Sequence, residues 1–372
     1  MALVLLIAAC GDDSGGSIID AHPHDAPVDG EAAHIRGFEV SGDYTAGDPG
    51  VLDQVDVTAS AIQTDVGPSL AVGDDPILRF DAANDLLYIV NRADGNNVTI
   101  IDAATHELVE QLGTGASSNP QDVAVVGNKL YVPVYGGTGV AVLTRGSTAI
   151  DTIDLSADDP DGMPNCNSAI VAGGKVYVSC ELLDDSQMFP PPRGNGMVYV
   201  IDPTSGDVTA SLELSTVNPF GNFETIPAGA HAGDLVIPTV SFNDGSGCIE
   251  RVATTGTPTA AGCLVENDDL GNYASRVSFS GAQMLLAVPS PDFTMAALRS
   301  YDLGTGTLAT DSLTPATQIV ADVVGCQDGS IVVADSTAAS AGLRIYRDGG
   351  EATSTPLAID NPSFSSHGLA CD

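Results

Sequence analysis

A repeated set of short strands constrains the fold of this chain more than any other feature of its sequence. Apolar runs separated by turns occur in three successive sets: residues 86–91, 97–102 and 107–112, then 129–134, 139–143 and 149–153, then 175–178, 196–202 and 208–212. A further strand that opens with a proline precedes each set, at Pro76, Pro120 and Pro164. Units of four strands with a period of about 45 residues are typical of β-propellers, whereas helical solenoids would show a period of 3.6 residues.

Three fainter units follow, and the two ends of the chain supply one more. The fainter units cover residues 218–266, 273–313 and 318–359. Residues 38–41, 51–57 and 61–66 match the second, third and fourth strands of a unit that lacks its first strand, and residues 363–371 match a first strand without successors. We therefore predict an all-β, seven-bladed propeller whose C-terminal strand pairs with the N-terminal strands. Such closure removes the unpaired edges that a linear array would expose.

Three segments also resemble a known repeat family. They are LYIVN at 87–91, NVTIIDAAT at 97–105 and NPQDVAV at 119–125, and they resemble the YVTN-type β-propeller repeats of bacterial and archaeal surface proteins. The resemblance is best from residue 75 to 214 and fades afterwards. It implies the propeller fold but little about activity, because propellers host many unrelated functions.

The balance of charges excludes several classes of partner. The formal net charge is −37, and Lys129 and Lys175 are the only lysines. Proteins that follow nucleic-acid phosphates need a basic face, so we expect no nucleic-acid binding. The same charge disfavours attraction to anionic lipid head groups. Hydrophobic residues make up 43% and charged residues 16% of the chain, which suits a globular, turn-rich β protein.

The N-terminal residues predict the location of the protein. Residues 1–9 are apolar but too few to span a bilayer, which is typical of a signal peptide. Residues 6–10, LIAAC, resemble the bacterial lipobox, in which the cysteine becomes lipidated. We therefore expect a lipid on Cys10 and an extracytoplasmic protein anchored at the cell envelope, at the outer membrane or cell surface. The alternative is an ordinary secretory signal that contains a chance cysteine.

Residues 10–34 connect this signal to the propeller, which is expected at residues 35–372. Gly, Ser, Asp, Pro and Ala predominate in the segment, with almost no apolar periodicity. This composition is typical of a disordered, acidic tether. His22, His24 and His34 lie in or beside it, so a weak metal-binding tail is the alternative.

The six cysteines after Cys10 form an even number, as in many exported proteins with disulfides. Two pairs are equidistant from a predicted hairpin turn, and such residues face one another at a distance that a disulfide can bridge. The last two fall at the same position of adjacent innermost strands, where a bridge would close the ring. The alternative is buried free thiols. The predicted pairs are Cys166–Cys180, Cys248–Cys263 and Cys326–Cys371.

Each innermost strand is expected to place one polar residue at the mouth of the central channel. Alternating charges there could bind a small polar ligand or a cation. Alternatively, mutually satisfied ion pairs and waters fill the channel, which is the interpretation we prefer because alternating charges neutralise one another. The residues are Arg79, Asp122, Ser168, Glu224, Arg276, Asp322 and His367.

The loop that contains Asp158, Asp159 and Asp161 carries oxygen ligands of the kind calcium takes. Its spacing does not match an EF-hand, so a solvated turn is the preferred interpretation. The sequence contains no Gly-x-Ser-x-Gly elbow, no P-loop and no Cys-x-x-Cys pair. We therefore expect no cofactor, with calcium as the one candidate.

These features predict a monomeric, lipid-anchored propeller that binds a protein or a small polar ligand without catalysis. One alternative is a lactonase-like hydrolase, resembling other seven-bladed propellers, that uses Glu224, Arg276 and His367 at the channel mouth for acid–base chemistry. Another is a calcium-dependent structural protein of the cell surface.

Overall fold

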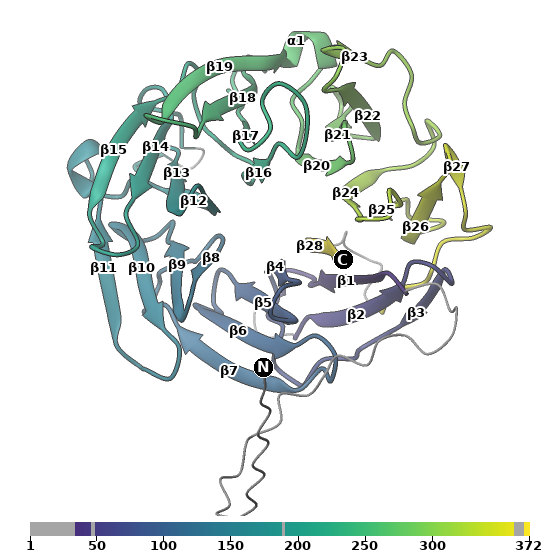
Figure 1. Cartoon of the computed structure of the whole chain (residues 1–372), viewed down its shortest axis with the longest axis horizontal. Coiled ribbons are helices and arrows are strands. Elements are labelled where there is room, and N and C mark those ends of the chain that lie inside the picture. Colours follow the sequence, from purple (N-terminus) through teal and green to yellow (C-terminus); the bar gives the residue numbers. More distant parts are fainter. Residues whose placement is uncertain (1–33, 46–48, 188–189, 361–367) are drawn as a thin grey trace, which may run out of the picture. The chain divides into compact units, whose positions relative to one another are not determined.

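Seven antiparallel sheets of four strands each make up the part of the chain that the structure describes (Figure 1). The structure is a computed structural model and describes residues 34–45, 49–187, 190–360 and 368–372. The sheets lie as blades around a central channel, which confirms the predicted seven-bladed β-propeller. The predicted signal peptide, Cys10, the tether up to residue 33 and His367 lie outside the described residues.

Six blades follow one another along the chain, and in each the first strand lies nearest the channel. Blade 1 contains β4 (Pro76–Asp81), β5 (Leu86–Asn91), β6 (Asn97–Asp102) and β7 (Leu108–Gly113). Blade 2 contains β8 (Ala124–Val126), β9 (Lys129–Pro133), β10 (Gly139–Thr144) and β11 (Ile150–Asp154). Blade 3 contains β12 (Cys166–Ala172), β13 (Lys175–Cys180), β14 (Met197–Ile201) and β15 (Val208–Glu213).

The remaining sequential blades are built in the same way. Blade 4 contains β16 (Glu224–Thr225), β17 (Leu235–Pro238), β18 (Cys248–Ala253) and β19 (Thr259–Glu266). Blade 5 contains β20 (Arg276–Ser280), β21 (Gln283–Pro289), β22 (Ala296–Asp302) and β23 (Thr307–Leu308). Blade 6 contains β24 (Val320–Gly325), β25 (Ile331–Asp335), β26 (Gly342–Arg347) and β27 (Gly350–Glu351). Short helical turns lie at Ser156–Asp158 and at α1 (Asn267–Leu270).

The second and third strands of each blade are the most apolar because neighbouring blades cover both of their faces. Every residue of β5 is buried, whereas most residues of the outer strand β7 are exposed. Hydrophobic side chains therefore pack between blades. Seven hydrophobic clusters occur in the described residues, and each joins two neighbouring blades, so that together they connect every blade to the next. Burial of one large apolar side chain contributes about 2 kcal/mol.

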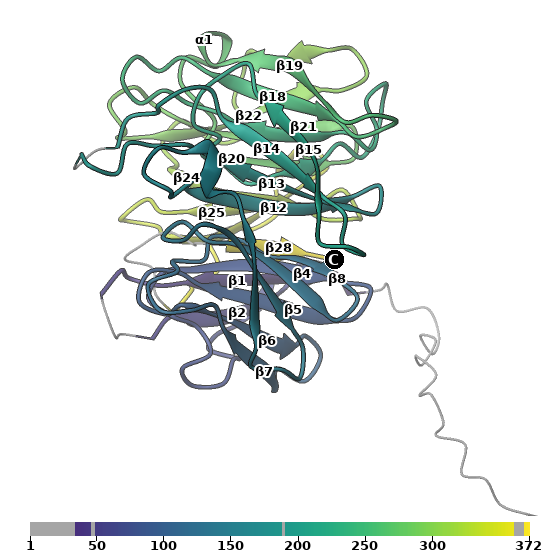
Figure 2. The same cartoon turned by 90° about the vertical axis from the view of Figure 1, so that its left-hand side faces the viewer.

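The closing blade joins the two ends of the described chain. From the channel outwards it contains β28 (Gly368–Cys371), β1 (Arg36–Ser41), β2 (Val51–Asp56) and β3 (Ala61–Gln63). β28 pairs antiparallel with β1, with Cys371 opposite Gly37, and lies beside it in both views (Figures 1 and 2). Arg36 Nε also lies 2.9 Å from Asp372 Oδ2. The predicted closure by the C-terminal strand is confirmed.

All three predicted disulfides are present. Cys166 and Cys180 face one another across β12 and β13, as predicted, although the turn lies at residues 173–174 and a bulge between Cys166 and Ser168 is needed to bring the two cysteines opposite one another. Cys326, which follows β24, is bonded to Cys371 of β28 and thereby ties blade 6 to the closing blade. The covalent link therefore lies at the joint where the ring closes.

The third disulfide, Cys248–Cys263, has a different geometry from the predicted one. Register shifts between β18 and β19 place Cys263 opposite Glu250. Cys248 lies two residues away from Glu250 on its own strand, so the bridge runs diagonally across the two strands. The predicted register was wrong because equal distance from a turn implies facing residues only in a hairpin without bulges.

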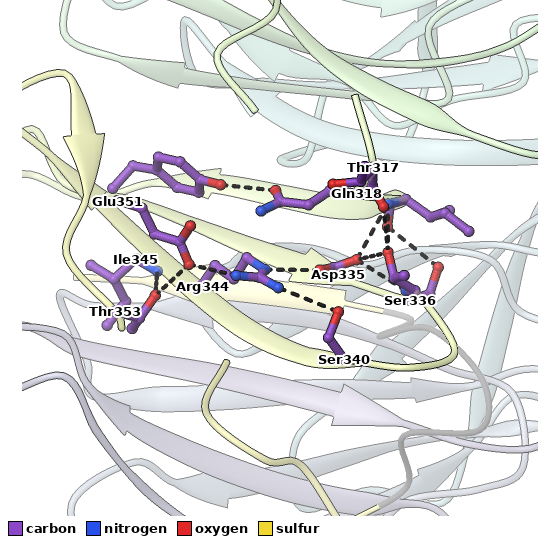
Figure 3. A network of polar contacts seen from close by, with 12 residues as sticks. Thr317, Gln318, Asp335, Ser336, Ser340, Arg344, Ile345, Glu351 and Thr353 are labelled. Carbon is purple, nitrogen blue, oxygen red and sulfur yellow. Dashed lines mark hydrogen bonds and ion pairs between the residues drawn. The ribbon is translucent and has the colours of Figure 1, made fainter. Parts of the chain in front are cut away.

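A polar network holds the loops of blade 6 together (Figure 3). Arg344 of β26 lies between two carboxylates, with Nε 2.8 Å from Asp335 Oδ2 and Nη1 2.6 Å from Glu351 Oε1. Asp335 also accepts hydrogen bonds from the Thr337 side chain and from the backbone N–H of Ile319. The Asp335 side chain is fully buried, so these donors compensate its lost hydration.

Candidate ligand site at the mouth of the channel

The predicted channel residues within the described structure do not all lie at one level. Arg79 faces Tyr88 across blade 1. In blade 3, the counterpart of Tyr88 is Tyr177. Ser168 faces Ser179, which lies two residues after Tyr177. Arg79 is therefore two residues further along its strand than Ser168. From this position its guanidinium reaches Asp122 of the neighbouring blade.

Asp122 is fully buried and its carboxylate accepts five hydrogen bonds. The donors are Arg79 Nε at 2.7 Å and Nη2 at 2.8 Å, Ser168 Oγ at 2.7 Å, and the backbone N–H groups of Val123 at 2.8 Å and Ala169 at 3.0 Å. Ser168 Oγ accepts a further bond from the backbone N–H of Phe223, at 2.9 Å. Because this chain of bonds runs through blades 1 to 4, it fixes the innermost segments of four blades relative to one another.

The other half of the ring is less tightly paired. Glu224 Oε1 lies 3.5 Å from Arg79 Nη1, and Arg276 Nε lies 3.6 Å from Asp322 Oδ1. Burial raises the pKa of Glu224 to about 7, although the positive charge of Arg79 opposes the shift. Glu224 is thus a carboxyl that can exchange a proton near neutral pH.

The acidic loop before blade 3 contains an ion-pair cluster. Arg193 Nε lies 3.3 Å from Asp159 Oδ1, and Arg193 Nη2 lies 2.6 Å from Asp161 Oδ2. Asp158 accepts a hydrogen bond of 2.7 Å from the Tyr199 hydroxyl. Asp159 is buried, so the preferred interpretation of a solvated turn was wrong for this residue. The guanidinium takes the place between the carboxylates that a metal ion would need.

One group in the described residues brings metal-type ligand atoms within 4.8 Å of one another: Cys248, Glu250 and Cys263. Both sulfur atoms belong to the disulfide, and metals bind the thiolate form of cysteine. Glu250 accepts hydrogen bonds from the backbone N–H of Ser215 at 2.6 Å and the Thr216 hydroxyl at 2.7 Å. While the disulfide is intact, these residues do not offer a metal site.

A cavity of about 500 Å³ lies at the mouth of the channel. We call it the mouth cavity. Its wall is formed by the segments that lead into the first strands and by the loops that follow the second strands. It shares Ile77, Asn222 and Arg276 with a smaller pocket of the channel that Arg79 and Glu224 line. Its volume lies within the range of small-molecule sites.

Two buried residues in the wall of the mouth cavity carry polar atoms that have no hydrogen-bond partner among the described residues. Glu181 is 5% exposed, and its carboxyl makes no hydrogen bond to any residue the structure describes. Burial raises the pKa of Glu181 to about 8, and the charge of Asp185 adds to the shift. Asn218 is 3% exposed; its Nδ2 donates to the Val240 carbonyl, but its Oδ1 has no partner. Buried groups of this kind are costly unless a ligand or water satisfies them.

The sequence prediction missed three wall residues that occupy equivalent positions in successive blades. They share a simple relation to the repeat, because each lies four residues after the tyrosine of its second strand. The pairs are Tyr88 and Arg92, Tyr131 and Tyr135, and Tyr177 and Glu181. One feature of the sequence could have identified these residues. From blade to blade the strand before this position keeps its apolar pattern, whereas the side chain at the position changes its chemical type.

Aromatic rings line one side of the mouth cavity and continue beyond it. The ring centroids of Phe220 and Phe242 lie 5.1 Å apart, and those of Phe242 and Tyr273 lie 5.5 Å apart, both with edge-to-face geometry. The ring centroid of Phe293 lies 6.4 Å from that of Tyr273. Phe242 and Phe293 are 57% and 63% exposed, so the cavity opens beside an apolar surface.

Comparisons with known proteins show which solved structures have a fold similar to that of this chain. No protein-family model matches it, and no curated protein has a matching sequence. A solved structure described as a "putative 6-phosphogluconolactonase" from Bacteroides uniformis superposes with a TM-score of 0.63 at 11% identity, over 91% of this chain and 99% of that one. These likenesses establish the fold alone.

Two further structures are similar to the same degree. A protein with the same description from Bacteroides fragilis has a TM-score of 0.62 at 13% identity, over 93% of this chain and 100% of its own. A protein from Lactobacillus plantarum has a TM-score of 0.63 at 14% identity, over 91% and 100%. In the described part of the chain, no helix is both long and apolar enough to span a bilayer.

Proposed function

We propose that the protein binds a small polar ligand in the mouth cavity, as an extracytoplasmic binding protein of the bacterial cell envelope. The observation that carries the proposal is Glu181, a carboxyl that is 5% exposed, lines the cavity and has no hydrogen-bond partner among the described residues. Its oxygens are not among the fully buried unpartnered atoms of the described residues, so they are open to the cavity. A ligand donor that takes the place of water there forms a charge-assisted hydrogen bond with the ionised carboxyl.

The network below the cavity supports binding to a rigid site. The five hydrogen bonds on Asp122 hold blades 1 to 3 in fixed positions, so the wall residues that these blades carry are preorganised. Preorganisation improves affinity because little conformational entropy is lost on binding.

The proposed location rests on the lipobox-like residues before Cys10 and on the disulfides. Disulfides persist in oxidising compartments and are rare in the cytosol. Metabolic labelling with a radioactive fatty acid tests the anchor: the protein should be labelled and the Cys10→Ala variant should not. Equal labelling of both would show that Cys10 does not carry the lipid.

Binding itself is testable with a small-molecule panel of amines, acids, polyols, sugar acids and short peptides. At least one member should raise the melting temperature of the protein, and Glu181→Gln should weaken that shift at least tenfold in ligand concentration. Glu107→Gln, an exposed glutamate far from the cavity wall, is the matched control. A ligand response that both variants keep in full would contradict the site.

A second candidate is lactone hydrolysis in the channel below the cavity. Glu224, whose pKa is raised to about 7, lies with Arg276 in the same pocket, and two structural neighbours are described as putative lactonases. Glu224 would remove a proton from water, the water oxygen would attack the lactone carbonyl, and Arg276 would stabilise the oxyanion. The ring C–O bond would then break as the oxyanion collapses, and Glu224 would return the proton to the leaving alkoxide. Hydrolysis of 6-phosphogluconolactone above the spontaneous rate, lost in Glu224→Gln, would favour this candidate over binding alone.

A further inference from the structure

We infer that the ligand of the mouth cavity is an elongated zwitterion, with a cationic amine at one end and a carboxylate at the other, as in a short peptide. The inference rests on the proposed function and specifies the ligand class of the same site. One acidic and one basic side chain, Glu181 and Arg276, line the cavity from blades that are not adjacent.

Arg276 of blade 5 forms the pole that would bind the carboxylate. Its Nη1 donates to the Ser275 carbonyl at 2.9 Å, and its Nε lies 3.6 Å from Asp322. Asp322 also accepts hydrogen bonds from the backbone N–H groups of Val323 and Leu369, at 2.8 and 3.1 Å. Asp322 thus divides its carboxylate among several donors, and it lies 3.6 Å from Arg276 Nε, which is long for a hydrogen bond. Arg276 therefore keeps N–H groups that can donate to a ligand carboxylate.

The second arginine of the cavity, Arg92, is already engaged. Its Nη2 forms an ion pair with Asp75, and its Nη1 donates to Gln121 Oε1 at 3.2 Å. Its remaining Nε has no hydrogen-bond partner among the described residues, but it is buried, so it cannot reach a ligand in the cavity. Arg276 is therefore the better partner for an anionic group of the ligand.

Glu181 of blade 3 forms the pole that would bind the amine. Tyr135 and Glu181 both line the mouth cavity. Burial raises the pKa of the Tyr135 hydroxyl, and the charges of Glu181 and Asp185 add to the shift. The cavity wall there offers acceptors for ammonium N–H groups and an aromatic ring suited to a cation. No lysine or arginine forms an ion pair with Glu181 among the described residues.

The segment before blade 4 lies between the poles and contributes Asn218, Phe220 and Asn222 to the wall. Amide side chains pair well with peptide groups. Because a whole blade separates Glu181 from Arg276, the two ligand charges must lie at opposite ends of the molecule. A ligand that carries only one charge would leave the other pole without a partner. We therefore expect such a ligand to bind more weakly than a zwitterion.

Blocked peptides test the inference directly. The probes are trialanine, N-acetyl-trialanine, trialanine amide and the doubly blocked peptide, with 6-aminohexanoate as a zwitterion that has no peptide groups. Calorimetric titration should show that trialanine binds and that blocking either end weakens it at least tenfold. If 6-aminohexanoate binds as tightly as trialanine, the ligand is still a zwitterion, but it is an ω-amino acid rather than a peptide.

Two variants assign the ends of the ligand. Glu181→Gln should abolish the difference between trialanine and N-acetyl-trialanine but keep the difference between trialanine and its amide. Arg276→Gln should do the reverse, and Glu107→Gln should change neither. Titrations in buffers of different ionisation enthalpy should also show proton release when trialanine binds near pH 7, and Glu181→Gln should lose that release.

The failures of the two proposals are distinguishable. If N-blocked or C-blocked peptides bind as well as trialanine, or if only polyols or sugar acids bind, the zwitterion is wrong while the mouth cavity remains a ligand site. If no compound of the whole panel binds, both proposals are wrong.

Discussion

The guanidinium of Arg79 and the carboxylate of Asp122 join neighbouring blades through two hydrogen bonds of 2.7 and 2.8 Å. The Asp122 side chain is fully buried and Arg79 is 25% exposed. Removal of one partner of such a pair costs more than the pair contributes, because the remaining charge stays buried and unpaired. Substitution of either residue should therefore lower the free energy of unfolding by more than the loss of the two hydrogen bonds alone.

Asp122→Ala should lower the free energy of unfolding by about 3 kcal/mol. The substitution leaves Arg79 without its bidentate partner and the backbone N–H groups of Val123 and Ala169 without an acceptor. Guanidinium denaturation measures the effect. Asp151→Ala, on the exposed outer strand β11, is the control and should change stability by less than about 0.5 kcal/mol. Equal stability of the two variants would show that the network does not hold the blades together.

Removal of residues 363–372 should open the ring and lower the melting temperature of the whole propeller. The truncation deletes β28 and leaves the inner edge of β1 unpaired. The double variant Cys326→Ser with Cys371→Ser keeps the strand but loses the cross-link, which should cost about 4 kcal/mol by chain entropy. A truncated protein that melts like the full chain would show that closure by β28 is dispensable.

Stability should fall as the pH rises from about 5 to 8. Glu181 and Glu224 lose their protons near pH 4.5 when unfolded, but near 8 and 7 when folded. Between these values the folded chain binds more protons, so the free energy of unfolding decreases by up to about 1.4 kcal/mol per pH unit for each group. Glu181→Gln should make the slope shallower, and Glu107→Gln should not. A Glu181→Gln slope equal to that of the unmodified protein would refute the shifted titration.

Calcium should leave the melting temperature of the unmodified protein unchanged, because Arg193 already lies among Asp159, Asp161 and Asp184. Arg193→Ala should be less stable and should recover stability in millimolar calcium, and EDTA should reverse the recovery. Arg193→Lys keeps the positive charge and should not respond. A calcium shift in the unmodified protein would instead favour the calcium-dependent structural alternative.

Most of the fold could be predicted from the sequence because the repeat encodes it locally. The runs around Tyr88, Tyr131 and Tyr177 carry apolar residues suited to strands that are covered on both faces. The register of Cys248 and Cys263 could not be predicted, because the bulges of β18 and β19 have no clear sequence signature. Bulges follow from packing around the strands, which a single sequence does not display.

The candidate site was harder to predict than the fold. Counting along the innermost strands found Arg276, which lines the mouth cavity, and Glu224, which lies in the channel below it. It could not find Glu181, because the cavity depends on how loops from several blades converge. The position of Glu181 in the repeat was readable, but its burial without a partner is a property of the assembled ring.

The sheet order of the closing blade has a consequence for biogenesis. β28 follows every other strand in the sequence, yet it occupies the innermost place in the blade that begins with β1. During synthesis, the inner edge of β1 therefore stays unpaired while six other blades are made. The Cys326–Cys371 bond can form only after β28 has emerged, so oxidation of this pair marks chains that have been made through residue 371.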